Sequence, residues 1–165
     1  MGHPKRTTSK DTIMRDELAE RIGGKRTALL GVGNPMRGDD GLGPALIDLL
    51  QGRVEAVLID AGEVPENFMG SLQAACPQVV VIVDALEMGI GPGGVDLLEL
   101  EQLCNPLGLP SSPGLARLGR LIRELTGADV FVLGVQPASS SPEASLSGPV
   151  VASLQRLGDL FEQLI

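Results

Sequence analysis

The fold is indicated most clearly by residues 28–43, which read ALLGVGNPMRGDDGLG. The stretch opens with a short apolar run, continues through a glycine-rich turn and reaches two aspartates before a second apolar segment. An apolar run as short as 28–32 is too short for a helix and is typical of a buried strand. The stretch therefore predicts a strand, a turn and the start of a helix.

The same order of features recurs along the chain. Short apolar runs rich in branched residues predict four further strands, at 54–59, 79–83, 95–100 and 130–135, with 95–100 at an edge. Apolar positions three and four residues apart predict helices within 13–22, 42–50, 67–76, 115–125 and 150–164. Strands that alternate with helices imply a mostly parallel sheet covered on both faces.

We therefore expect a three-layer α/β/α fold with a mostly parallel, twisted sheet of about five strands. The length of 165 residues suits one domain, which we assign to residues 11–165. Residues 1–10 are polar and predict a disordered tail, and 138–148 is rich in Ser and Pro and predicts a loop.

Composition excludes several classes of function. Thirteen Lys and Arg against 21 Asp and Glu give a net charge of -8, and three Phe are the only aromatic residues. A nucleic-acid binder needs clustered cations and stacking rings, so no nucleic-acid partner is expected. His3 is the only histidine, which rules out a metal site built on several imidazoles within this chain.

Cysteine usage and hydropathy predict a cytoplasmic protein that does not enter a membrane. Cys76 and Cys104 are isolated, so we expect two buried, reduced thiols rather than a metal knuckle or redox motif. No apolar run approaches the roughly 20 residues of a membrane span. A monomer is the default expectation.

Aspartates stand at the carboxyl ends of three predicted strands, all of which we expect to be central. Asp39 and Asp40 follow the first, Asp60 the second and Asp84 the third. Ligands of doubly wound sheets bind at this edge, where the strand order reverses. Carboxylates gathered there repel one another unless a cation joins them. Singly, each has an ordinary structural explanation: one of Asp39 and Asp40 is expected to cap the following helix, and turns favour Asp.

The glycine-rich turn also suggests a nucleotide, but the details disagree. Met36 stands where the dinucleotide fingerprint needs its third glycine, and the acidic end of the turn would repel a pyrophosphate. A bound cation fits these residues better.

Four blocks of sequence resemble the hydrogenase maturation endopeptidases. They are Gly31-x-Gly33-Asn34-Pro35-x-x-x-Asp39-Asp40-Gly41-x-Gly43; Ile59-Asp60-Ala61-Gly62 with Val64-Pro65-Glu66-Asn67; Ile82-Val83-Asp84-Ala85 with Gly91-Pro92-Gly93; and Leu133-Gly134-Val135-Gln136-Pro137. The second block is most similar to the branch that serves formate-hydrogenlyase-type and related group 4 nickel-iron hydrogenases.

The resemblance implies an endopeptidase that removes the C-terminal extension of a hydrogenase large-subunit precursor, after nickel has been inserted into that precursor. The nickel arrives with the substrate and is not permanently bound. Asp40 and Asp84 correspond to the family's metal-binding carboxylates, and Asp60 to a third carboxylate of the catalytic pocket. The resemblance assigns the surroundings of the substrate tail to Gly33, Asn34, Asp39 and Gly62.

One family residue is absent. The family carries a metal-binding histidine just before the helix expected at 115–125, where this chain has Pro113 or Gly114. Ser112 is expected to cap that helix, and His3 lies in the predicted tail. Three hypotheses follow: an active site completed differently, a divergent substrate, or a non-catalytic binding and assembly factor for a hydrogenase-type complex.

Overall fold

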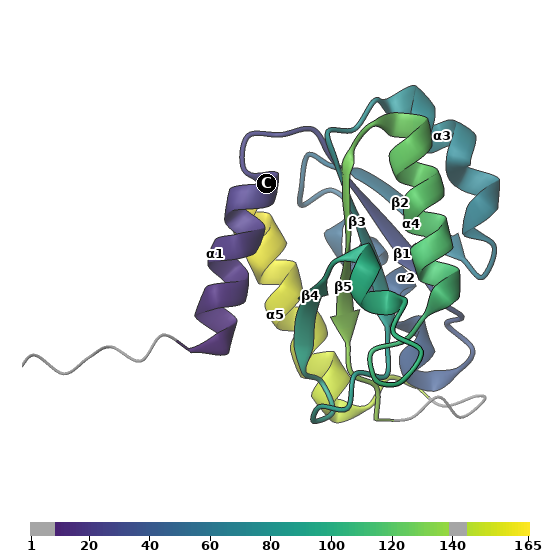
Figure 1. Ribbon diagram of the computed structural model, residues 1–165. Coiled ribbons are helices and arrows are strands. Elements are labelled where there is room, and N and C mark those ends of the chain that lie inside the picture. The colour runs from purple at the N-terminus through teal and green to yellow at the C-terminus, as the bar shows by residue number, and fades with distance from the viewer. Residues whose placement is uncertain (1–8, 139–144) are drawn as a thin grey trace, which may run out of the picture.

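A computed structural model describes residues 9–138 and 145–165 (Figure 1). Its elements, in chain order, are α1 (Lys10–Ile22), β1 (Thr27–Val32), the 3-10 turn η1 (Gly38–Gly41), α2 (Leu42–Leu50), β2 (Val57–Gly62), η2 (Pro65–Phe68), α3 (Met69–Ala75), β3 (Val79–Ala85), β4 (Val95–Leu98), η3 (Leu100–Leu103), α4 (Pro113–Thr126), β5 (Asp129–Val135) and α5 (Gly148–Leu164). Most of the tail predicted for residues 1–10 lies outside the described residues, while Lys10 already begins α1.

The strands form one five-stranded sheet in the order β2-β1-β3-β5-β4. All neighbouring pairs are parallel except β4 and β5, which are antiparallel. The predicted α/β class, the mostly parallel sheet and the edge position of β4 are confirmed. Because β2 and β3 lie on opposite sides of β1, the strand order reverses between β1 and β3.

Helices cover both faces of the sheet, as the alternation predicted (Figure 1). On one face, α1, α2 and α5 bury side chains such as Leu18, Leu46 and Phe161 against the odd-numbered positions of β3. On the other, α3 and α4 bury Leu72 and Ile122 against the even-numbered positions of the same strand. Within the described residues, no helix is long and apolar enough to cross a bilayer.

Three expectations were wrong: the bounds of β2, its central position and the burial of the two cysteines. Strand β2 covers Val57–Gly62 instead of 54–59 and lies at an edge of the sheet rather than in its centre. Glu55 interrupts the apolar run, and pairing with β1 starts only where Val57 meets Ala28. The two cysteines are exposed rather than buried, because each follows the end of a short helix.

Helix α2 begins in direct contact with the ends of β1 and β3. A Cβ atom at Gly43 would lie 2.4 Å from the carbonyl oxygen of Val32 and 2.6 Å from that of Val83. A Cβ at Gly31 would lie 2.5 Å from the carbonyl oxygen of Gly43. No side chain fits in either place, so these two glycines allow the first turn of α2 to sit on the point where the strand order reverses.

Gly43→Ala is therefore expected to destabilise the protein by about 1–3 kcal/mol, because the added methyl group forces the helix away from two strands. Gly70→Ala is the matched control. Gly70 also lies in a helix, but its Cβ would meet no heavy atom within 4 Å, so alanine should be neutral or stabilising by up to about 1 kcal/mol. Urea unfolding measures the free energy of unfolding of both variants. Equal changes in the two would refute the close approach of α2 to β1 and β3.

Candidate functional site

Asp40 is held by a loop that folds back upon it. It lies in η1, directly before α2, and its Oδ2 accepts a 2.9 Å hydrogen bond from the backbone N–H of Asn34. Gly33 has φ +134°, and a Cβ there would lie 1.9 Å from the carbonyl oxygen of Asp40. Only glycine fits this position, which explains why the turn between β1 and η1 needs it.

Asp84 approaches the same place from β3. The strand pairs with β1 through Val83 and Gly31, so Asp84 lies one residue beyond the last paired position. Side chains alternate along a strand, and Ile82 packs on the face covered by α3 and α4, so Asp84 belongs to that face. The side chain is partly buried.

The environment of Asp84 favours its protonated form. Burial is the larger cause and the negative charge of Asp40 the second; together they raise the pKa of Asp84 from 3.8 to about 8. The backbone N–H of Ala85 acts in the opposite direction but is outweighed. The structure thus brings Asp40 and Asp84 close enough to interact, as the sequence predicted for the ends of neighbouring strands.

Such a pair suits a divalent cation supplied from outside. The two carboxylates repel each other when both are ionised, and a cation between them would remove that repulsion and displace the proton. Within residues 9–138 and 145–165, no group of three or more His, Cys, Asp or Glu side chains could hold a metal ion. The pair can therefore complete the coordination of a metal that already has other ligands.

Asp60 does not join this pair. Its neighbours Ile59 and Ala61 pack on the α3–α4 face, so alternation turns Asp60 towards the opposite face, where it is exposed. Its Oδ1 accepts a 3.2 Å hydrogen bond from the N–H of Gly62, and the carbonyl of Gly62 accepts a 2.9 Å bond from the N–H of Gly33. Asp60 and Gly62 thus border the Gly33 loop, which in turn lies against Asp40.

Asp39 has a role that the sequence did not reveal. Its side chain is fully buried and accepts hydrogen bonds from the backbone N–H of Ala138 (2.8 Å), the N–H of Ser147 (2.7 Å) and the Ser147 hydroxyl (2.8 Å). The carboxylate thereby ties both ends of the β5–α5 connection to the residue next to Asp40. Its predicted contact with a substrate stays a prediction.

The expectation that one of Asp39 and Asp40 caps a helix was wrong. Neither η1 nor α2 has a side-chain cap, because both carboxylates are engaged by backbone groups outside those turns. Nothing in the local sequence marks Ser147 as a partner of Asp39, since the two are 108 residues apart.

The position of the absent histidine is occupied by the first turn of α4. Ser112 caps this helix as expected, accepting a 3.4 Å bond from the N–H of Leu115. A Cβ at Gly114 would meet no heavy atom within 4 Å, so the space that a larger side chain needs is open. His3 lies outside the described residues.

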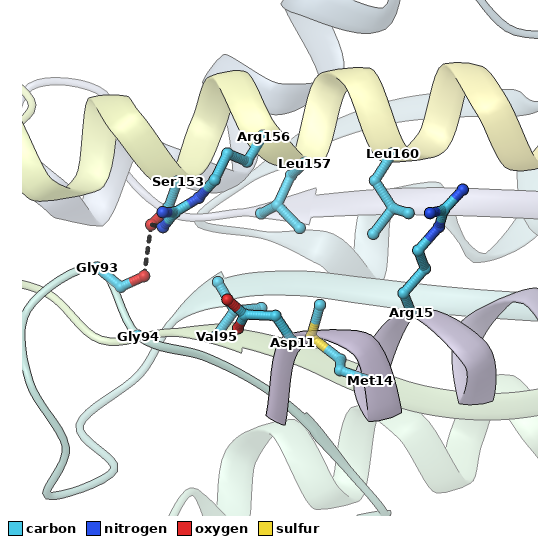
Figure 2. Close-up of a pocket in the computed structure, with 10 residues that line it drawn as sticks. All are labelled: Asp11, Met14, Arg15, Gly93, Gly94, Val95, Ser153, Arg156, Leu157 and Leu160. Atoms are coloured by element: carbon cyan, nitrogen blue, oxygen red, sulfur yellow. Dashed lines mark hydrogen bonds between the residues drawn. The ribbon is translucent and has the colours of Figure 1, made fainter. Parts of the chain in front are cut away.

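A separate pocket of about 210 Å³ lies between α1, α5 and the start of β4 (Figure 2). Met14, Leu157 and Leu160 supply an apolar lining, and Arg15 and Arg156 reach its two ends (Figure 2). The hydroxyl of Ser153 donates to the carbonyl of Gly93 and fixes one wall. None of the carboxylates discussed above lines this pocket.

Comparisons with known proteins identify the family of the chain. The HycI family, described as hydrogenase maturation protease, matches residues 45–163. The "Hydrogenase 3 maturation protease" of Escherichia coli K12 is 34% identical over 112 residues, which are 66% of this chain and 71% of that protein.

Solved structures give the same result. The crystal structure of the [NiFe] hydrogenase maturation protease HycI from Thermococcus kodakarensis superposes with a TM-score of 0.80 at 29% identity, covering 90% of this chain and 97% of that one. The solution structure of the endopeptidase HycI from Escherichia coli has a TM-score of 0.75 at 28% identity, covering 84% and 90%. The family resemblance derived from the sequence is confirmed.

The raised pKa of Asp84 predicts that this side chain lowers the free energy of unfolding by an amount that depends on pH. Between about pH 4 and pH 8 the unfolded chain loses the Asp84 proton while the folded protein keeps it, so this group's contribution to stability falls as pH rises. Asp84→Asn should therefore be more stable than the parent at pH 8 by about 2 kcal/mol, less than the whole shift implies because the side chain is partly exposed. The advantage should shrink towards pH 4. Urea unfolding at several pH values measures it, and a pH-independent difference would contradict the assigned environment.

Proposed function

Because the chain belongs to the hydrogenase maturation protease family, we propose that it is an endopeptidase acting on the large-subunit precursor of a nickel-iron hydrogenase. It removes the C-terminal extension after nickel insertion, and the metal belongs to the substrate. The precursor is its protein partner, and the cytoplasm is where it acts. The proximity of Asp40 and Asp84 is the observation that carries the proposal.

The carboxylate pair supplies the recognition step. A nickel ion held only in part by the precursor can take hard oxygen ligands from Asp40 and Asp84. Below about pH 8 Asp84 keeps a proton that metal binding would displace, so the pair gains a favourable contact only when the loaded precursor arrives. An unloaded precursor offers no cation and leaves Asp84 protonated. The enzyme therefore distinguishes the two precursors by the metal itself.

The resemblance assigns Asp60 to the same pocket, and we propose that it orients the substrate tail. Its exposed carboxylate lies beside the Gly33 loop, on the opposite face of the sheet from Asp84. In this proposal Gly33, Asn34 and Gly62 line the path of the substrate tail, while Asp39 acts by holding the β5–α5 connection against the loop of Asp40.

A second candidate is a non-catalytic assembly factor that binds a hydrogenase-type precursor without cutting it. The observation that favours it is the first turn of α4, where Pro113 and Gly114 offer no metal ligand. Both candidates use the carboxylate pair to bind, but only the first predicts a shortened large subunit.

A cleavage assay separates the two candidates. The purified protein is incubated with a nickel-loaded precursor and with the same precursor lacking nickel, and the large subunit is followed by gel mobility and mass spectrometry. We expect a shortened product only with nickel. Asp40→Asn or Asp84→Asn should reduce kcat/KM by at least about 100-fold, because each removes a metal ligand.

Asp48→Asn is the matched control, since Asp48 is an exposed carboxylate on α2 and should leave the rate unchanged. Tight binding of the loaded precursor without any product, while a homologous protease cleaves its own precursor in parallel, would establish the assembly factor instead.

Gly114→His tests whether a third ligand is what the site lacks. The first turn of α4 lies at the carboxyl edge of the sheet, on the face of Asp84, and the space around Gly114 is open. If the parent chain holds the metal weakly, histidine should raise its affinity for the loaded precursor at least about tenfold. Gly114→Gln, of similar length but a poor nickel ligand, is the control. Equal affinities of the two variants would show that the site is completed in another way.

A further inference from the structure

Four large apolar side chains are exposed on loops at the edge of the sheet that carries the carboxylate pair. Met36 follows β1 and is 67% exposed, and Val64 follows β2 and is 51% exposed. Leu107 and Leu109 lie in the loop before α4 and are 95% and 54% exposed. We call these four residues the apolar rim.

Contacts between the loops place the members of the apolar rim on both sides of the pair. The bond from Gly33 N–H to the carbonyl of Gly62 joins the loops of Met36 and Val64. On the other side, a Cβ at Gly89, in the loop after β3, would lie 3.6 Å from Cδ1 of Leu109. Since β2, β1 and β3 are adjacent, Asp40 and Asp84 lie between these two groups of loops.

This arrangement differs from ordinary surface exposure. Single exposed apolar residues are common on monomers, but several at one edge beside a functional site mark an interaction surface. A protein segment that delivers a metal to Asp40 and Asp84 has to pass between the loops after β1 and β3. It would therefore meet the apolar rim first.

The charged side chains on the same loops indicate the charge that a partner segment should carry. Glu63, Glu66 and Glu87 are exposed around the apolar rim, and Arg37 is the exposed cation on the described part of these loops. A segment with apolar side chains flanked by Lys or Arg is complementary to this surface in both respects.

We propose that the apolar rim is the docking surface for the substrate segment next to the cleavage point, and that this segment is apolar with flanking basic residues. The inference rests on the proposed function and extends it by naming what recognises the polypeptide. Metal recognition by Asp40 and Asp84 and polypeptide recognition by the rim are then separable.

The test compares two variants of exposed residues. Leu107→Ser with Leu109→Ser removes one side of the apolar rim, and Ile13→Ser is the matched control, because Ile13 is 56% exposed on α1, away from the loops. Equilibrium affinity for the nickel-loaded precursor and, separately, kcat and KM for cleavage are measured for the parent and both variants. Thermal unfolding checks that all three are folded.

We expect the double variant to bind at least about tenfold more weakly and to show a raised KM with little change in kcat, while Ile13→Ser matches the parent. Binding should also weaken in high salt, since the carboxylates of Glu63, Glu66 and Glu87 contribute through charge. Unchanged affinity in the double variant, or an equal loss in Ile13→Ser, would overturn the docking surface.

The outcomes also separate this inference from the proposed function. A parent protein that binds the precursor through the apolar rim but never cleaves it would refute the endopeptidase and leave the docking surface intact. Normal cleavage and affinity in the double variant would refute the docking surface and leave the endopeptidase intact. If sedimentation shows a parent dimer that the double variant abolishes, the rim joins two copies of this chain and the proposal is wrong.

Discussion

The start of helix α2 lies so close to β1 and β3 that no side chain fits at Gly43, and the site depends on this constraint. Asp40 precedes Gly43 by three residues, and Asp84 follows Val83 directly. Gly43 lies so close to Val83 that a Cβ atom on it would be 2.6 Å from the Val83 carbonyl oxygen. A helix held further from the sheet would carry Asp40 away from Asp84. The close contact of backbone with backbone therefore sets the distance between the two carboxylates.

The rest of the edge stabilises this arrangement. The folded loop at Gly33 positions the N–H of Asn34 against one oxygen of Asp40. Asp39 satisfies three donors from the β5–α5 connection and is buried completely. The placement of Asp84, by contrast, costs stability at any pH at which the unfolded chain would ionise this carboxyl group. Stability given up at one side chain is a common cost of a functional site.

The sequence predicted much of this because local signals and topology agree. Short apolar runs, their aspartate endings and the glycine spacing were sufficient for the α/β class and for placing Asp40 beside Asp84. Three features depend on contacts between distant segments and could not be predicted: the edge position of β2, the burial of Asp39 by residues 138 and 147, and the side of the sheet that Asp60 faces. The three-residue offset in the bounds of β2 does not change which of its side chains share a face, because alternate residues of a strand share a face wherever the strand begins. Interior and edge positions are decided only by the whole sheet.

Because the family's histidine is absent, the proposed contact with the metal depends on Asp40 and Asp84 alone. With Pro113 and Gly114 at the start of α4, only Asp40 and Asp84 are proposed here as metal ligands, and the described part of the chain holds no group of three or more such side chains. The apolar rim offers a physical way to compensate, because affinity for the polypeptide can add to a weakened affinity for the metal. Recognition of the precursor would then depend on two surfaces rather than on the metal site alone.

Asp40 and Asp84 act on each other at the carboxyl ends of β1 and β3. Carboxyl-detected NMR titration of Asp84 tests it directly, in the parent and in Asp40→Asn. We expect a midpoint near pH 8 in the parent and a clearly lower midpoint in the variant, which lacks the neighbouring charge. A midpoint near pH 4 in the parent, or one that does not move when Asp40 is neutralised, would contradict it.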